Sequence, residues 1–120
     1  MHHSTKLLSC ATLLCIGASA FAQDAVAGKA AFASCAACHS VEARNGVGPS
    51  LLGVVGRKAG SFAGFRYSEA MKGAAAWDAA SLDAFIANPQ RAIPGNAMPF
   101  AGVGDAKVRA DIVAYLGTLK

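Results

Sequence analysis

Histidine and cysteine are scarce in this chain of 120 residues, which holds three histidines and four cysteines. Two of the histidines and two of the cysteines fall within the first fifteen residues. If that N-terminal segment is removed, only Cys35, Cys38 and His39 remain, and they lie within five consecutive positions. Any activity that needs a histidine must then use His39, which excludes sites built from several histidines.

The sequence also lacks, near its N-terminus, an apolar run of the roughly 20 residues that cross a membrane. The apolar run from Leu7 to Ile16 is followed by small residues that end at Ala22, a pattern typical of a secretory signal. We therefore predict a signal peptide over residues 1–22, a periplasmic or otherwise exported location, and one domain over residues 23–120. Two alternatives stay open: a buried N-terminal helix, and a lipoprotein signal around Cys10.

Basic residues are too few and too scattered for a nucleic-acid-binding surface. The formal net charge of the whole chain is +4, and it falls to about +3 when Lys6 leaves with the signal, because 10 basic and 7 acidic residues remain. Binding to nucleic acid needs lysines and arginines gathered on one face, so we predict no nucleic-acid partner. A domain this small has a modest hydrophobic core, so its fold is expected to need extra stabilisation from a covalent cross-link or a cofactor.

The helical pattern is clearest near the C-terminus, where apolar residues recur every three or four positions from Val108 to Leu119, after Asp105 as a candidate N-cap. Three further helices are predicted over residues 25–34, 68–74 and 78–88. Asp24 and Ser68 are candidate N-caps, and Pro89 disfavours helix at the residue before it. Two loops are predicted, over residues 45–64 and 90–104, and no segment alternates convincingly like a strand.

The motif that carries chemistry is Cys35-Ala36-Ala37-Cys38-His39, the C-x-x-C-H pattern of haem c attachment. Two cysteines three positions apart lie on one helical turn, where both can form thioethers with the vinyl groups of one porphyrin. The next residue, His39, then has a ring nitrogen aimed at the iron. A zinc site, a thioredoxin-like redox pair and a structural disulfide are the alternatives. Zinc needs about four ligands, a thioredoxin-like pair would be expected beside a βαβ pattern that is missing here, and a disulfide would leave His39 unexplained.

A sixth iron ligand must come from another part of the chain, and methionine is the available candidate. Met98 lies between Pro94-Gly95 and Pro99, where regular helix is disfavoured, so a shaped loop displays it. Met71 lies at an apolar helical position, where methionine usually fills a core. We therefore predict Met98 as the second axial ligand, and His/Met ligation would raise the haem potential.

Beyond this motif, the chain resembles the class I cytochrome c family, the mitochondrial-type cytochromes c and their bacterial relatives. The resemblance covers nearly all of residues 23–120. It is carried by an ordered set of anchors: Gly28, Phe32, Cys35 to His39, Gly48 to Leu51, Gly56 to Gly60, Gly64 to Ser68, Trp77, Asn88-Pro89, Pro94-Gly95, Met98, Phe100 and Tyr115-Leu116. It implies an all-α cytochrome c fold of three to five helices, with long loops around one covalently bound haem c.

The resemblance also implies roles for residues outside the motif. Gly28 would let the first and last helices cross closely, and the carbonyl of Pro49 would accept the second ring N–H of His39. Arg57, Tyr67 and Trp77 would hold a buried haem propionate by hydrogen bonds.

Some positions depart from the family pattern. Phe85 stands where many relatives have a tyrosine near the methionine sulfur, and Met71 replaces a common asparagine near the haem. Arg91 and Ala97 stand where mitochondrial relatives usually have lysines. We therefore expect docking to rely less on steering by charge.

The function expected from this resemblance is that of a soluble, non-enzymatic, monomeric one-electron carrier that cycles between ferric and ferrous iron. Its partners would be membrane or soluble oxidoreductases, such as a terminal oxidase, and it would have no small-molecule substrate. Two alternatives remain open. A dedicated electron-accepting subunit of a dehydrogenase would use the same residues, whereas a gas-binding haem protein would need a missing or labile sixth ligand.

Overall fold

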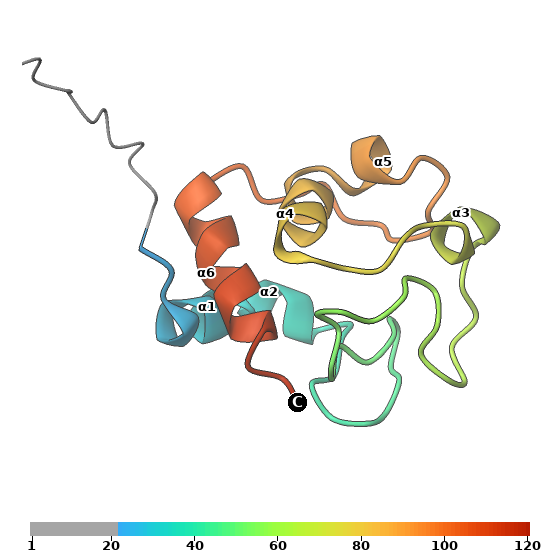
Figure 1. The fold of residues 1–120 in the computed structure, drawn as a ribbon, viewed down its shortest axis with the longest axis horizontal. Helices are drawn as coiled ribbons and strands as arrows, with labels where there is room; N and C mark the ends of the chain where they lie inside the picture. Colours follow the sequence, from blue (N-terminus) through green and yellow to red (C-terminus); the bar gives the residue numbers. More distant parts are fainter. Residues whose placement is uncertain (1–21) are drawn as a thin grey trace, which may run out of the picture.

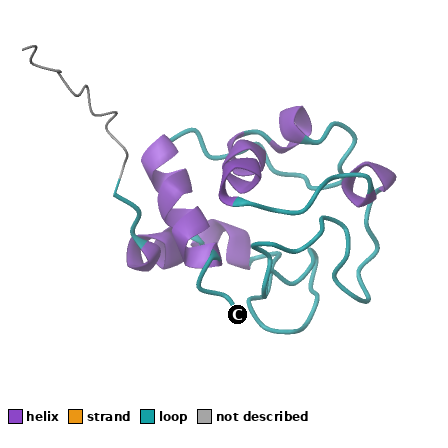
Figure 2. Cartoon of the chain, viewed as in Figure 1, coloured by secondary structure: helices purple, strands orange, loops and turns teal. Residues whose placement is uncertain are grey.

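The computed structural model describes residues 22–120, and within this range the chain forms six helices and no β-strand. The helices are α1 (Ala25–Ala31), α2 (Ala33–Ala36), α3 (Glu69–Lys72), α4 (Ala79–Ala87), α5 (Pro89–Ala92) and α6 (Ala106–Leu116). Long loops follow α2 and α5, whereas single residues separate α1 from α2 and α4 from α5 (Figure 2). The predicted all-α architecture is confirmed. The number of helices exceeds the predicted three to five for two reasons. Phe32 divides the first predicted helix into α1 and α2, and α5 is an additional single turn.

Three helices begin at the capping residues that the sequence predicted, Asp24, Ser68 and Asp105. The Asp24 carboxylate accepts hydrogen bonds from two backbone N–H groups of α1, and Ser68 caps α3 in the same way. Asp78 forms a reciprocal capping box with Ser81 at the start of α4, and Asp105 caps α6. These bonds satisfy backbone donors that have no partner within a helix, so local sequence alone fixes where the helices start.

The prediction of an uninterrupted loop over residues 90–104 is wrong at its beginning, where α5 lies. The helix α4 ends before Asn88, whose backbone is extended, as expected of a residue that precedes proline. Pro89 then occupies the first position of α5, where a missing N–H costs nothing, and the Asn88 side chain caps this turn. The same proline therefore ends one helix and begins the next.

The core forms where α1 crosses α6, with α4 packed beside them. Its buried apolar residues are Phe32, Val54, Leu82, Ile112, Val113 and Leu116. The crossing is close because α1 presents Gly28, where a Cβ would lie 1.9 Å from the carbonyl oxygen of Asp111. Phe32 and Tyr115 pack edge to face beside it, with ring centroids 5.4 Å apart. The implied role of Gly28 in this crossing is therefore present in the structure.

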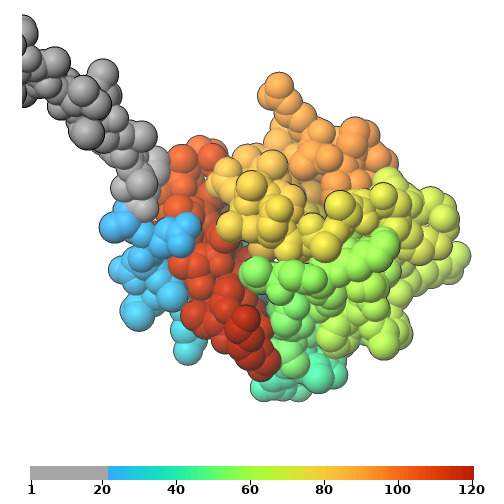
Figure 3. All heavy atoms as spheres, viewed as in Figure 1, coloured from blue at the N-terminus to red at the C-terminus, as the bar shows by residue number. Residues whose placement is uncertain are grey.

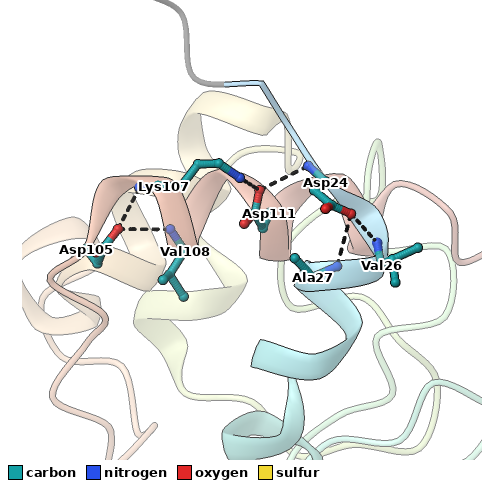
Figure 4. Close-up of polar contacts among 7 residues, drawn as sticks. All are labelled: Asp24, Val26, Ala27, Asp105, Lys107, Val108 and Asp111. Atoms are coloured by element: carbon teal, nitrogen blue, oxygen red, sulfur yellow. Dashed lines mark hydrogen bonds and ion pairs between the residues drawn. The ribbon is translucent and has the colours of Figure 1, made fainter.

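A polar contact fastens the start of α1 to α6 (Figure 4). The carboxylate of Asp111, which is 6% exposed, accepts a hydrogen bond of 3.0 Å from the backbone N–H of Asp24. The ammonium group of Lys107, one turn earlier on α6, pairs with the same carboxylate. The hydrogen bond from Lys107 holds the pKa of Asp111 below its usual range.

On one flank of the domain, the N-terminal segment of the described chain (blue) lies against α6 (red) (Figure 3). The loop after α2 lies on one side of the domain, and the loop after α5, in orange, lies on the opposite side (Figure 1). The two segments that contain the predicted iron ligands therefore face one another across the domain.

The predicted signal peptide, residues 1–22, lies outside the described residues except for Ala22, and it stays a prediction. Between residues 22 and 120, no helix has the length and apolar character that crossing a bilayer requires.

Candidate functional site

The C-x-x-C-H motif occupies the end of α2 and the turn that follows it. The backbone N–H groups of Cys38 and His39 both donate to the carbonyl of Cys35, at 3.1 and 3.0 Å. This turn gathers the two thiols and the imidazole within one helical repeat. Both cysteines are free thiols; Cys35 is half-buried and Cys38 is exposed. Burial raises the pKa of the Cys35 thiol, so at neutral pH this group is held as a thiol.

The imidazole of His39 is oriented by a single strong hydrogen bond. Its Nδ1 lies 2.7 Å from the carbonyl oxygen of Pro49. A carbonyl oxygen can only accept, so Nδ1 carries the proton and donates. The neutral ring therefore keeps its lone pair on Nε2, which is the atom free to bind a metal. A bond of this kind also fixes the ring's direction and strengthens the opposite nitrogen as a ligand.

Glycine at position 48 is what allows the chain to pass so close to this ring. A Cβ on Gly48 would lie 2.6 Å from Cε1 of His39 and 2.8 Å from its Nδ1. Any larger residue would push the loop away from the ring and with it the carbonyl of Pro49. The sequence Gly48-Pro49 therefore provides both the space and the acceptor that His39 needs.

The loop that carries Pro49 is held by Asn45 and Ser50. The Asn45 side chain accepts a hydrogen bond from the Ser50 N–H at 3.0 Å and donates to the carbonyl of Ala63 at 2.9 Å. Ser50 is completely buried, and its hydroxyl donates to the carbonyl of Glu42. These bonds tie the loop after His39 to the loop before Tyr67. The acceptor of the His39 hydrogen bond is thus part of a connected network.

Arg57 is a partly buried cation without a carboxylate partner among residues 22–120. Its two terminal nitrogens donate to the carbonyls of Ser50 and Leu52, both at 2.9 Å. Its Nε is buried and has no hydrogen-bond partner. Burial lowers the pKa of this guanidinium, but arginine does not lose its proton in proteins. A buried, charged donor with nothing to donate to marks a place for an anion.

The main chain of Trp77 and the side chain of Tyr67 lie near Arg57. The backbone N–H of Trp77 donates to the carbonyl of Arg57 at 2.9 Å, beside an antiparallel bridge between Lys58 and Ala76. The Tyr67 hydroxyl accepts a bond of 3.1 Å from the N–H of Phe62, and the Phe62 ring stacks 4.9 Å from the Arg57 guanidinium. The main chain of Trp77 and the ring of Phe62, whose N–H is bound by Tyr67, therefore lie beside Arg57.

Met98 lies half-buried in the loop after α5, and the loop is shaped by its neighbour Asn96. The Asn96 side-chain oxygen accepts a hydrogen bond of 2.9 Å from the Met98 N–H. Met71, the other methionine of the described range, lies in α3 as predicted. Phe85 is buried in α4 and packs edge to face on Trp77 at 5.2 Å.

Two hollows lie beside these residues. One, of about 480 Å³, is lined by Cys38, His39 and Phe32 together with the loop after α2. The other, of about 370 Å³, is lined by Trp77, Phe85 and several alanines. Among residues 22–120, no three His, Cys, Asp or Glu side chains gather to hold a metal ion. The zinc alternative therefore has no ligand set in this part of the chain.

The residues present fit a covalently attached haem. Two free thiols and an imidazole with a free Nε2 share one turn, which is the donor set that attachment and axial ligation need. The unpartnered Nε of Arg57 supplies a buried cation for which a propionate is the matching anion.

Sequence reasoning assigned no role to four residues that shape this site: Asn45, Ser50, Phe62 and Asn96. The only signals available were the Asn-Gly pair at 45–46, typical of a turn, and the position of Asn96 after Pro-Gly. Both signals mark loops without showing which backbone groups the amides bind.

Comparison with known proteins places the chain among cytochromes. The sequence profile of the family described as "Cytochrome c" matches residues 25–120. Cytochrome c2 iso-2 of Magnetospirillum fulvum is 52% identical over 74% of this chain and 95% of its own length. Cytochrome c2 of Rhodomicrobium vannielii is 44% identical over 94% of each chain. The solved structure of cytochrome cH from Methylobacterium extorquens superposes with a TM-score of 0.76 at 49% identity, over 79% of this chain and 98% of its own.

Proposed function

The chain belongs to the cytochrome c family, and we propose that it is a one-electron carrier whose single haem c is attached through Cys35 and Cys38 and ligated by His39 and Met98. Members of this family carry one covalently bound haem c. When bound, that group supplies the one-electron change between ferric and ferrous iron. The protein's own residues supply attachment, ligation, charge balance and exclusion of other ligands.

The observation that carries the proposal is the hydrogen bond between His39 and Pro49. It leaves the Nε2 lone pair free, on the same turn as two unpaired thiols. A disulfide between the two cysteines would give the imidazole no reason to be held in this tautomer, and a zinc ion would find no group of three His, Cys, Asp or Glu side chains among residues 22–120. Haem ligation does, because a ring that donates from Nδ1 is a stronger and better oriented donor from Nε2.

Met98 completes the ligation and decides between carrying electrons and binding gases. Its loop lies across the domain from the loop that carries His39 (Figure 1). A thioether is a weak but sufficient ligand that stabilises ferrous iron. With His39 and Met98 both bound to the iron, a small molecule such as carbon monoxide would have to displace Met98 in order to bind. A site closed in this way suits electron transfer.

Arg57, with Tyr67 and Trp77 beside it, would bind a haem propionate. One nitrogen of the partly buried guanidinium, Nε, is itself buried and has no hydrogen-bond partner. A carboxylate there would satisfy this donor and neutralise the charge. The Phe62 ring covers one face of the guanidinium and limits its contact with water. The propionate would therefore be held in the fold while the rest of the porphyrin is fixed by the thioethers.

The partners we propose are redox proteins, such as a membrane oxidoreductase or terminal oxidase, in the periplasm or another exported compartment. Four ion pairs already join eight of the charged side chains to one another: Arg44–Glu42, Lys72–Glu69, Lys107–Asp111 and Arg109–Asp83. Locally paired charges contribute little to a long-range field. The rate of association with a partner should therefore depend only weakly on charge. We also propose that the protein acts as a monomer.

The test is a set of visible absorption spectra of the holoprotein in ferric and ferrous states, with and without carbon monoxide. We expect low-spin ferrous bands, a methionine–iron charge-transfer band in the ferric form and no response to carbon monoxide. Met98→Ala should lose the charge-transfer band and bind carbon monoxide. Met71→Ala is the matched control and should keep the wild-type behaviour, because it removes the other methionine of the described range.

Each possible result identifies the iron ligands or the mode of haem attachment. A wild-type protein with high-spin iron that binds carbon monoxide would refute the carrier function and favour a gas-binding role. Loss of the charge-transfer band in Met71→Ala, and not in Met98→Ala, would reassign the sixth ligand while leaving the haem attachment intact. Haem that washes out of Cys35→Ala, Cys38→Ala protein but not out of wild type would confirm the two thioethers.

A further inference from the structure

The loop that bears Met98 is built around one buried side chain. Asn96 is 6% exposed, although asparagine is usually a surface residue. Its amide nitrogen donates to the carbonyls of Pro89 and Ile93, both at 2.8 Å, and its side-chain oxygen accepts from the N–H of Met98 at 2.9 Å. The amide nitrogen of Asn96 therefore makes two hydrogen bonds and its oxygen makes one, all within this loop and α5.

The backbone of Asn96 belongs to the same arrangement. Its N–H donates to the carbonyl of Ile93 at 3.2 Å, and its carbonyl accepts from the side chain of Gln90 at 2.8 Å. Asn96 is thus hydrogen-bonded to Pro89 and Gln90 in α5, to Ile93 at the end of that helix and to the N–H of Met98. The preceding Gly95 has a φ of 85°, which reverses the chain so that the amide can reach back.

We infer that Asn96 is a positioning residue for the iron: it joins α5 and Met98 into one block and thereby holds the thioether at the axial site. The inference rests on the proposed ligation by Met98. Because the N–H of Met98 is fixed relative to Pro89 and Ile93, the methionine backbone cannot move away without breaking buried hydrogen bonds. Displacement of the sulfur by another ligand must then work against this network.

Only asparagine combines these functions at this position. It has two N–H donors and a carbonyl acceptor on a short side chain. Aspartate has no donor for the carbonyls of Pro89 and Ile93, and serine has a single hydroxyl that can replace the acceptor more weakly. Glutamine is one methylene longer in a buried site. These differences give a graded series: asparagine should hold Met98 best, serine less well and alanine least.

The experiment measures how readily imidazole replaces Met98 on the ferric holoprotein, followed by loss of the methionine–iron charge-transfer band. Loss of one buried hydrogen bond changes an equilibrium roughly five- to tenfold, so Asn96→Ala should bind imidazole at least about tenfold more tightly than wild type. Asn96→Ser should lie between the two. Asp78→Ala is the control, because it removes a helix cap on α4 that does not contact the Met98 loop. Stability of each variant to guanidinium chloride is measured in parallel.

If Asn96→Ala and Asn96→Ser are destabilised but bind imidazole no more tightly than Asp78→Ala does, the role of Asn96 is structural only and the inference fails. If Asn96→Ala does not fold, the comparison of Asn96→Ser with wild type decides. The proposed function fails in a different way: wild-type protein would then lack the charge-transfer band and bind imidazole without competition, as Met98→Ala should. The two failures are therefore distinguishable in one titration.

Discussion

The crossing of α1 and α6 offers the sharpest prediction, because its geometry depends on the absence of a single carbon atom. A Cβ on Gly28 would lie 1.9 Å from the carbonyl oxygen of Asp111 and 2.5 Å from its carbon. An ordinary carbon–oxygen contact is about 3.3 Å, so Gly28→Ala must push the helices apart by roughly 1.4 Å. The position of a Cβ is set by its own backbone and its clashing partner is a backbone carbonyl, so no side-chain rotation can relieve the clash.

The cost follows from what this separation disrupts. Overpacking of a core costs about 1–3 kcal/mol, and the edge-to-face pair of Phe32 and Tyr115 beside the crossing is worth about 0.5–1.5 kcal/mol. Alanine recovers about 1 kcal/mol through its higher helix propensity. Because the clash cannot relax, we expect Gly28→Ala to lower the free energy of unfolding by about 3 kcal/mol.

Guanidinium chloride denaturation of the holoprotein measures this loss. Gly73→Ala is the matched control: Gly73 has a φ of −82°, and the nearest atoms to its added Cβ lie at 3.6 and 3.7 Å. We expect the control to stay within about 0.5 kcal/mol of wild type. The reasoning would be refuted if Gly28→Ala were as stable as the control, since helices that can separate without loss are not closely packed.

Four further predictions concern charge and pH. Replacing Arg57 with Gln removes a cation near the haem, so the reduction potential should fall by on the order of tens of millivolts, whereas Arg57→Lys should fall less; equal potentials in a potentiometric titration would contradict this. The pKa of Asp111 is lowered by the hydrogen bond from Lys107, so its stabilising effect is present above the ordinary aspartate pKa of about 3.9 and is lost as pH falls through the lowered folded value. Asp111→Asn should therefore be less stable than wild type at pH 7, and a stability difference that stayed constant on acidification would show that this carboxylate is not involved. Exchange of methionine for lysine at high pH should be suppressed, because Arg91 stays protonated and Ala97 has no ligand atom; early loss of the charge-transfer band with a lysine-ligated spectrum would argue against it. Reduction of a terminal oxidase should slow only slightly between low and moderate salt, and a many-fold decrease would show that charge steers docking after all.

The helices could largely be predicted from the sequence because their signals are local. Asp24, Ser68 and Asp105 cap helices that begin directly after them. The apolar repeat of the last helix contains the buried Ile112 and Leu116. Caps and repeats of this kind act over one or two turns, so neighbouring residues suffice to predict them.

The extra turn α5 could not be predicted in the same way. The rule that a helix stops before proline is correct for Asn88, but proline is also a favourable first residue of a new helix. Which of the two follows depends on whether the next turn finds partners. Here it does, because the carbonyl of Pro89 and that of Ile93 are bound by an amide from outside the turn.

The residues of the site likewise fall into those that local sequence predicts and those that depend on contacts between distant segments. Cys35, Cys38 and His39 are adjacent in sequence, so spacing alone predicts that they act together. The cation–π contact of Arg57 with Phe62 has no such signal. The guanidinium is held in place by the carbonyls of Ser50 and Leu52, while the main chain of Arg57 pairs with that of Trp77, twenty residues further along the chain.

Each segment that carries a proposed iron ligand is shaped by an asparagine. Asn45 binds the N–H of Ser50, directly after the carbonyl that orients His39, and Asn96 binds the N–H of Met98. In both cases the amide oxygen fixes one backbone group and the amide nitrogen ties it to another part of the fold. An amide does not titrate in the pH range where proteins are stable, so neither connection should weaken on mild acidification. Loss of ligation in acid should therefore follow global unfolding, driven by carboxylates such as Asp111, rather than precede it.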